Sequence, residues 1–518
     1  MLFRSEEEHE PVAAKRAPKS VVDKKLIKPA TNKKAADTFV IEEKSEASAP
    51  KRATKPATTK KTSKQAVSKD DKVLAKVEAK EDEEPSREPV AESQADTQEA
   101  KAKPDPSPVE KTVSKPTQPA SDYNLYMFGA DSCGELGLKK IGFSKKNPTL
   151  VPLGSNVKQV ACGPMHTIAL TAGGDVYSFG CNDEGALGRI TQDEDEEATP
   201  TVIQLDHKII KVTAGDSHSA ALSDDKKVYV WGNFRDEHGS VGLLPESNGE
   251  KTYKPMMVMP ETEFKDIASG SNHMLLLDVK GVVYSFGVGE QGQLGRIEPE
   301  NSGQDNGTEA KISSITAENR ATFLKPQPVC LKNVDPQRPF ICEAIYAGNY
   351  SSFARNNDLR KNRLAGWGLN NYHQLGYKGT KNQVVQHIPK RSTFTCSTSF
   401  IHVACGQHHT IFLTKTGRVF AAGRRDYGML GLGDVKTETV CPAQNVKFDR
   451  SVTAIATGIN TSFALTDEGK LFSWGMGGQS LGVDNEEDLK HPTEVKRLDG
   501  KKVISVSTGG DFTAVLAS

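Results

Sequence analysis

The sequence has no long hydrophobic run. No apolar stretch approaches the roughly 20 residues that a helix needs to cross a bilayer. The opening Met1-Leu2-Phe3-Arg4 leads into acidic residues rather than into the apolar core of a signal peptide. We therefore expect a soluble, intracellular protein without a membrane partner.

The chain also lacks the patterns of familiar metal and cofactor sites. Its eight cysteines include no CxxC pair and no metal-ligand spacing. There is no phosphate-binding GxxxxGK[ST], no HExxH and no dinucleotide fingerprint that opens a helix. We expect reduced, mostly buried thiols, no metal, no cofactor and no covalent chemistry, so the protein is not expected to be an enzyme in that sense.

Residues 1 to about 120 have almost no large apolar clusters and are rich in Lys, Ala, Pro, Ser, Thr and Glu. Such a segment buries too little apolar surface to offset an ordering entropy of roughly 1–2 kcal/mol per residue. We predict a disordered tail over residues 1–121 and a folded domain over residues 122–518.

The tail is basic on balance at first and acidic toward its end, although the whole chain has 67 basic and 67 acidic residues. Basic tails contact phosphate-rich or acidic partners, and a solvated linker is the alternative. Four basic pairs also fit a two-cluster nuclear-import signal. They are Lys24-Lys25, Lys33-Lys34, Lys51-Arg52 and Lys60-Lys61.

A unit that recurs along the rest of the chain is complete between residues 212 and 239. It opens with Gly215, has His218 three positions on, and reaches Trp231-Gly232 after a polar turn. Alternating apolar residues on both sides of that turn predict a β-hairpin. The two glycines then lie on one face of the fold, which we call the glycine face, and residues 224–226 lie on the opposite face.

Both glycines of the unit recur seven times. The first series is Gly163, Gly215, Gly270, Gly348, Gly406, Gly458 and Gly509, and the second is Gly129, Gly180, Gly232, Gly287, Gly368, Gly423 and Gly475. Members of the second series are 51 to 55 residues apart, with one separation of 81. This period, with strand patterning throughout, predicts an all-β, seven-bladed β-propeller closed by pairing of its N- and C-terminal strands.

Residues that repeat between blades are interpreted as structural. Histidine follows the first glycine by three positions at His166, His218, His273 and His409. A hydrogen-bonding strut explains such a repeat better than catalysis does. The aromatic residues before the second glycine are predicted to pack between blades.

Function is expected among residues that differ between blades on the glycine face. Asp216 and His408 follow first glycines and are the most chemically pointed. The turn Phe234–Val241 lacks the compact pattern of CNDEGALG and GEQGQLG, so it is predicted to project. Arg296 stands where an arginine reaches a carboxylate or phosphate. The alternative for each is a solvated loop residue.

Six strings then carry a family resemblance. They are GCNDEGALGR (180–189), AGDSHSAALSDD (214–225), GEQGQLGR (289–296), NNYHQLG (370–376), CGQHHT (405–410) and WGMGG (474–478). Over essentially all of residues 123–518, the chain resembles the regulator of chromosome condensation family, chromatin-bound nucleotide exchange factors for the small GTPase Ran.

The resemblance implies exchange without covalent chemistry, with one propeller face displacing Mg²⁺ and nucleotide and stabilising the empty GTPase. It assigns the central contact roles to Asp216, Asn272 and His408. Further GTPase contacts are implied at Asp131, Ser132, Phe234, Arg235, Asp236, Glu237, His238, Gly239, Glu246 and Arg296. Asn272 and Ser132 depart from the aspartate that the family pattern has at both places, and Asp131 is expected to substitute for its neighbour.

The resemblance also implies binding to nucleosome histones and DNA, an import receptor and a nuclear, chromatin-associated location. The inserted segment Glu298–Lys325 is mostly acidic or neutral, and Arg320 is its candidate for a histone contact. A propeller scaffold without exchange activity is the alternative. Light sensing, known among similar folds, needs clustered tryptophans, whereas Trp231, Trp367 and Trp474 belong to separate repeats.

Overall fold

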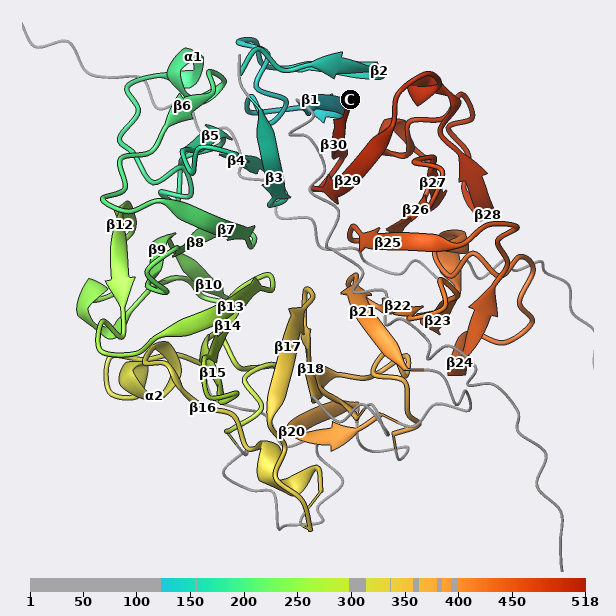
Figure 1. Ribbon diagram of the computed structural model, residues 1–518. Helices are drawn as coiled ribbons and strands as arrows, with labels where there is room; N and C mark the ends of the chain where they lie inside the picture. Colours follow the sequence, from blue (N-terminus) through green and yellow to red (C-terminus); the bar gives the residue numbers. More distant parts are fainter. Residues whose placement is uncertain are drawn as a thin grey trace, which may run out of the picture. The chain divides into compact units, whose positions relative to one another are not determined.

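Seven four-stranded antiparallel sheets form a closed ring in the computed structural model (Figure 1). The structure describes residues 123–153, 156–297, 314–335, 337–356, 363–379, 384–392 and 399–518. The predicted tail therefore lies outside the described residues. The all-β, seven-bladed propeller predicted from the repeat is confirmed.

Each blade runs from an inner strand at the central channel to an outer strand at the rim. Blade 1 is β3 (Val157–Cys162), β4 (His166–Thr171), β5 (Val176–Gly180) and β6 (Thr201–Val202); blade 2 is β7 (Ile209–Ala214), β8 (His218–Ser223), β9 (Val228–Gly232) and β12 (Thr252–Val258). Blade 3 is β13 (Phe264–Ser269), β14 (His273–Asp278), β15 (Val283–Gly287) and β16 (Gln327–Pro328); blade 4 is β17 (Cys342–Ala347), β18 (Ser351–Asn356), β19 (Leu364–Leu369) and β20 (Val385–Arg391). Blade 5 is β21 (Phe400–Cys405), β22 (His409–Thr414), β23 (Val419–Arg424) and β24 (Thr439–Val446); blade 6 is β25 (Val452–Thr457), β26 (Thr461–Thr466), β27 (Leu471–Gly475) and β28 (Leu489–Glu494).

Blade 7 closes the ring with strands from both ends of the repeat. Its order is β2 (Phe143–Leu150), β1 (Asn124–Asp131), β30 (Phe512–Ala517) and β29 (Val503–Thr508). β1 pairs with β30 from Asn124 opposite Ala517 to Gly129 opposite Phe512. The predicted pairing of N- and C-terminal strands is confirmed, and it leaves neither β1 nor β30 as an open edge strand.

Short elements outside the blades fill the connections. They are the hairpin strands β10 (Phe234–Asp236) and β11 (Gly239–Gly242), the helices α1 (Glu194–Glu197) and α2 (Arg320–Leu324), and the 3₁₀ turns η1 (Pro245–Ser247), η2 (Leu331–Asn333), η3 (Asp426–Gly428), η4 (Gln479–Leu481) and η5 (Lys496–Leu498). No helix among the described ranges is long and apolar enough to cross a membrane.

The glycine face forms as predicted. On this face the end of the third strand of a blade lies beside the start of the second strand. In blade 2, the Asn233 amide donates to the Ser217 carbonyl at 2.8 Å, which joins the end of β9 to the start of β8. Gly232 between them has a φ of +100°, and a Cβ there would stand 2.3 Å from the Ser217 oxygen. Only glycine fits that position.

Hydrogen bonds between blades form what we call a latch. At the joint of blades 1 and 2, Ser219 Oγ donates to the Ala186 carbonyl at 3.0 Å and lies 2.9 Å from His166 Nε2. Because the hydroxyl proton goes to the carbonyl, His166 is the donor to Ser219. Trp231 Nε1 donates to the same carbonyl at 2.8 Å.

The full latch recurs at two other joints. His273 and Ser352 join blades 3 and 4 at 2.8 Å, and His409 and Ser462 join blades 5 and 6 at 2.8 Å. Trp367 and Trp474 complete these two latches. The predicted hydrogen-bonding role is therefore confirmed for His166, His273 and His409. The predicted packing of the tryptophans between blades is also confirmed.

His218 is the exception among the four. The next blade places Met274 where the latched joints have serine, and Phe286 where they have tryptophan. Neither ring nitrogen of this fully buried imidazole has a hydrogen-bond partner in the described part of the chain. The strut prediction is wrong for His218, because its neighbour offers no hydroxyl.

Candidate functional site

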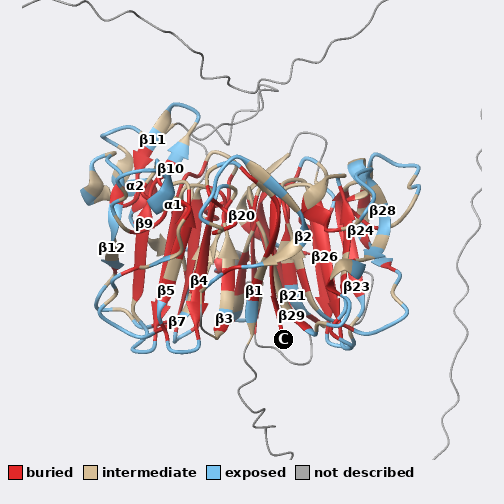
Figure 2. Cartoon of the chain, turned by 90° about the horizontal axis from the view of Figure 1, so that it is seen from above, coloured by how far each residue is buried: buried red, intermediate tan, exposed pale blue. Residues whose placement is uncertain are grey.

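The segment after β9 forms a projecting hairpin where the other turns are compact. β10 and β11 pair from Phe234 opposite Gly242 to Asp236 opposite Gly239. Figure 2 shows this hairpin standing above the ends of the blades, on the side of α1 and α2. The predicted projection of Phe234–Val241 is confirmed.

Phe234 fixes the root of the hairpin to the core. Its side chain is fully buried, with its ring centroid 4.7 Å from that of His218 and 5.7 Å from that of Phe286. It thus occupies the space beside the joint of blades 2 and 3 that lacks a latch. The expectation that Phe234 contacts the GTPase is wrong, because no part of it reaches the surface.

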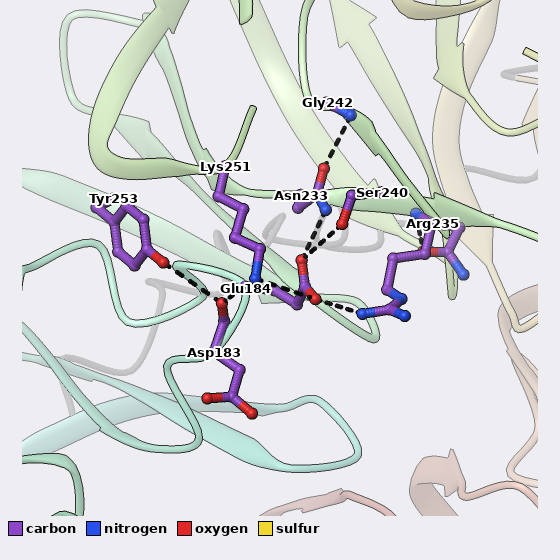
Figure 3. Close-up of polar contacts among 9 residues, drawn as sticks. Asp183, Glu184, Asn233, Arg235, Ser240, Gly242, Lys251 and Tyr253 are labelled. Atoms are coloured by element: carbon purple, nitrogen blue, oxygen red, sulfur yellow. Dashed lines mark hydrogen bonds and ion pairs between the residues drawn. The ribbon is translucent and has the colours of Figure 1, made fainter. Parts of the chain in front are cut away.

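Glu184, in the turn after β5, holds the other side of the hairpin (Figure 3). Its carboxylate accepts hydrogen bonds from Asn233 Nδ2 at 2.7 Å and Ser240 Oγ at 3.2 Å, and pairs with Arg235. Lys251 Nζ lies 3.5 Å away. Burial raises the pKa of Glu184, but these donors outweigh it and hold the pKa below its usual value.

Asn272 approaches the hairpin from blade 3. Its Oδ1 accepts the backbone N–H of Arg235 at 3.0 Å. An aspartate oxygen accepts such a bond equally well, so the departure from aspartate at this position preserves the contact.

The exposed tip of the hairpin is acidic. Asp236 Oδ1 accepts the backbone N–H of His238 at 2.8 Å, and Glu237 Oε1 lies 3.6 Å from His238 Nε2. The described end of the inserted segment adjoins the tip, with the Ile315 N–H 3.4 Å from Asp236 Oδ2. Arg320 starts α2, half-buried, with a guanidinium nitrogen beside Gly249.

Asp216 lies at the mouth of the central channel on the glycine face. The channel holds a cavity of about 360 Å³. The Asp216 N–H donates to the Ser271 carbonyl of blade 3 at 2.9 Å. Burial raises the pKa of Asp216 to about 6, against a smaller opposing effect of a hydrogen bond from Ser271.

His408 belongs to a second cluster at the joint of blades 4 and 5. Its ring packs edge-on against Tyr372 with centroids 5.1 Å apart, and Arg424 lies over Tyr372 at 5.0 Å. Asp426 anchors Arg424 through an ion pair of 2.6 Å. Burial, assisted by Arg424, lowers the pKa of His408, which favours the neutral imidazole.

The structure separates Ser132 from Asp131. Ser132 is exposed, whereas Asp131 is 2% exposed and accepts the Gly134 N–H at 2.7 Å. Burial and the adjacent carboxyl of Glu135 raise the pKa of Asp131. The expectation that Asp131 substitutes for its neighbour at a GTPase surface is wrong, because this carboxyl stabilises its own turn.

Arg296 lies against the connection of blade 3. Its guanidinium donates to the carbonyls of Ser285 at 3.3 Å, Thr322 at 2.8 Å and Phe323 at 3.1 Å. Arg189 makes the same kind of bonds in blade 1. These bonds hold the blade 3 connection, and because Arg296 remains partly exposed, its contact with a GTPase stays a prediction. The Leu-Gly-Arg shared by both turns was the available signal.

The remaining predicted residues divide by exposure. Arg235, Glu237, His238 and Glu246 are exposed, and Gly239 is half-buried with a φ of +121°. The predicted tail contacts at residues 24–61 lie outside the described residues. Among the residues placed by the structure, no group of three or more His, Cys, Asp or Glu is arranged to hold a metal. Seven of the cysteines are free thiols in this part.

Comparison with known proteins shows the family of this chain. The family model described as the RCC1-like domain matches residues 124–515. The chain belongs to the RCC1-like domain family. The match runs from the start of β1 into β30 and includes the hairpin and the insertion between β15 and β16.

Relatives of the RCC1-like domain family cover most of the chain. The human "Regulator of chromosome condensation" is 39% identical, over 75% of this chain and 89% of that protein. "Guanine nucleotide exchange factor SRM1" of Saccharomyces cerevisiae is 28% identical, over 75% and 86%. The crystal structure of Prp20p from the same yeast, described with its binding to Gsp1p and histones, gives a TM-score of 0.66 at 28% identity, over 76% and 91%. Prp20 bound to Kap60 also gives 0.66, at 27% identity, over 79% and 95%.

Proposed function

We propose that this protein is a guanine-nucleotide exchange factor for the small GTPase Ran. The observation that carries the proposal is the hairpin β10–β11, which is held by Phe234 and Glu184 above a face that also presents Asp216. We call the projecting part of this hairpin, residues 235–240, the wedge. A rigid projection among polar groups suits the displacement of a ligand from a partner protein. The name of the yeast relative SRM1 supports the same activity.

Exchange of this kind needs no covalent step. A GTPase that binds nucleotide with picomolar affinity holds it by about 16 kcal/mol, which the factor must offset by binding the empty form. By linkage, nucleotide weakens the factor to the same extent, so the complex is transient. We assign the wedge to the region of the phosphate loop and Mg²⁺, where the negative charge of Asp236 and Glu237 disfavours phosphate.

In this proposal the GTPase contacts residues on both sides of the channel. Arg235, Glu237, His238 and Glu246 present exposed groups near the hairpin, and Ser132 presents another in blade 7. Asp216 and His408 belong to blades 2 and 5. A GTPase that touches both is held in a fixed orientation against the wedge. Asn272 acts by holding the Arg235 backbone in place.

We further propose a nuclear protein that acts on chromatin. The lysine pairs of residues 1–121 would contact DNA phosphates or an import receptor, and Arg320 remains the candidate for histones. Prp20p, described with histones and with Kap60, supports these partners. Residues 122–518 form the exchange domain in this proposal. If deletion of residues 1–120 leaves chromatin retention unchanged, the tail has no such role.

The direct test is release of labelled GDP from purified Ran with and without the protein. We expect acceleration by the wild type and slower release with Asp216→Ala or His408→Ala. Folded wild type that accelerates nothing would instead favour a propeller scaffold that binds chromatin or protein without exchange. Full activity of both variants would overturn the assignment of Asp216 and His408.

A further inference from the structure

The hairpin β10–β11 depends on side chains of the blades for its position. Its strands have three and four residues and form a two-stranded sheet of their own. An isolated hairpin of that size is marginal in water. Its orientation above the glycine face is therefore set by the groups that hold it.

One carboxylate contacts both strands of this hairpin. Glu184 contacts Arg235 on β10 and Ser240 on β11. Through Asn233 it also reaches the end of β11, because Asn233 Oδ1 accepts the Gly242 N–H at 2.9 Å. Figure 3 shows these groups converging from both strands and from Lys251 on the returning chain.

Glu184 belongs to a different blade from all of its partners. It lies in the turn of blade 1, whereas Asn233, Arg235, Ser240 and Lys251 belong to the excursion of blade 2. Its side chain is 13% exposed. With donors around both oxygens, it has little surface left for a partner protein, so it acts through the hairpin.

We propose that Glu184 is the positioning residue of the hairpin, fixing the wedge relative to blade 1 for nucleotide exchange. The expected effect on nucleotide exchange rests on the proposed function. The expected effect on the hairpin rests only on the contacts described above. Charge-assisted hydrogen bonds of this kind are stronger and more directional than neutral ones. Loss of the carboxylate leaves the ring intact and the hairpin loose.

The test compares Glu184→Ala and Glu184→Gln with Gln291→Ala in the full-length protein. Gln291 holds the corresponding position in the turn of blade 3, before the same Gly-x-Leu-Gly pattern. Two readouts are needed: amide hydrogen exchange of residues 235–242, and steady-state GDP release from Ran.

With Glu184→Ala, we expect the hairpin amides to exchange about tenfold to a hundredfold faster while the blade strands stay protected, the range set by loss of charged hydrogen bonds. The kcat for GDP release should fall more than KM changes. Glu184→Gln keeps the side-chain length and one acceptor oxygen, so it should restore part of both. Gln291→Ala should match the wild type.

Unchanged hairpin protection in Glu184→Ala would overturn the inference whatever the exchange activity. A loosened hairpin with wild-type kcat would overturn its catalytic consequence. If the wild type itself releases no GDP, the proposed function fails separately, and the amide readout still decides whether Glu184 holds the hairpin.

Discussion

The joint of blades 1 and 2 and the joint of blades 2 and 3 solve the same packing problem differently. The first is joined by His166, Ser219 and Trp231 around the Ala186 carbonyl. The second has Met274 and Phe286 instead, and Phe234 of the hairpin packs beside the unpaired His218. The joint that lacks the latch hydrogen bonds is therefore the one against which Phe234, at the root of the hairpin, packs.

A second comparison extends this lesson. At the joint of blades 4 and 5, Thr410 holds the latch position, but among the described residues its hydroxyl makes no hydrogen bond to blade 4. His408, two residues before Thr410 in blade 5, packs across that joint onto Tyr372. Both joints without the hydroxyl bond therefore adjoin residues proposed to contact the GTPase.

Removal of the hairpin anchor should have the largest effect. Phe234→Ala empties a fully buried aromatic site, which typically costs about 3–5 kcal/mol. Because Phe234 supports the wedge, GDP release from Ran should fall as well. Urea unfolding and exchange assays check both effects. An unchanged free energy of unfolding would show that the stability of the ring does not depend on the packing of Phe234.

The latch can be tested with one substitution at two equivalent positions. Thr167 Oγ1 donates to the Glu135 carbonyl at 3.0 Å across the joint of blades 7 and 1, whereas Thr410 makes no such bond. Thr167→Val should lower the free energy of unfolding by about 1–3 kcal/mol, and Thr410→Val should not. Equal losses at both positions would erase the distinction between the two kinds of joint.

The histidines allow the same comparison with a smaller effect. Phe512 occupies the histidine position in blade 7, so the fold accepts phenylalanine there. His218→Phe should raise the free energy of unfolding by about 1 kcal/mol by removing unpaired buried nitrogens. His166→Phe should lower it, because the bond to Ser219 is lost. Thermal unfolding of both variants decides, and stabilisation by His166→Phe would contradict the latch.

A further effect concerns pH. The folded-state pKa of Asp216, about 6, lies above the ordinary value of 3.8. The native state therefore holds more protons than the unfolded state in this window, so stability falls as pH rises from about 4 to about 6. Asp216→Asn should remove that slope. If the ionised carboxylate contacts the GTPase, wild-type exchange should rise over the same window, and an identical profile in Asp216→Asn would exclude this role.

Periodicity made the ring, its closure and its glycine face predictable. The glycines at the blade ends and the alternating strands are local patterns, and seven copies of them fix the architecture. The departure of residues 234–241 from the compact turn was equally visible in the sequence and correctly marked the projecting hairpin.

Contacts between blades were harder to predict. Glu184 and Arg235 are 51 residues apart, and only the placement of neighbouring blades brings them together. Burial decided the errors at Phe234 and Asp131. Phenylalanine is commonly buried, so its residue type gave a signal, whereas aspartate is mostly exposed and its type gave none. The carbonyl partners of Arg296 at Thr322 and Phe323 lie 26 and 27 residues along the chain, and only the repeated Leu-Gly-Arg indicated them.

Release of labelled GDP from Ran by the wild type and by a variant with residues 235–240 replaced by two glycines tests the central claim most directly. The shortened turn keeps the buried Phe234 and Val241 and the blades in place, and it removes the projecting part of the hairpin. We predict fast release with the wild type and near-basal release with the variant. Equal acceleration by both proteins would contradict the assignment of exchange to the hairpin.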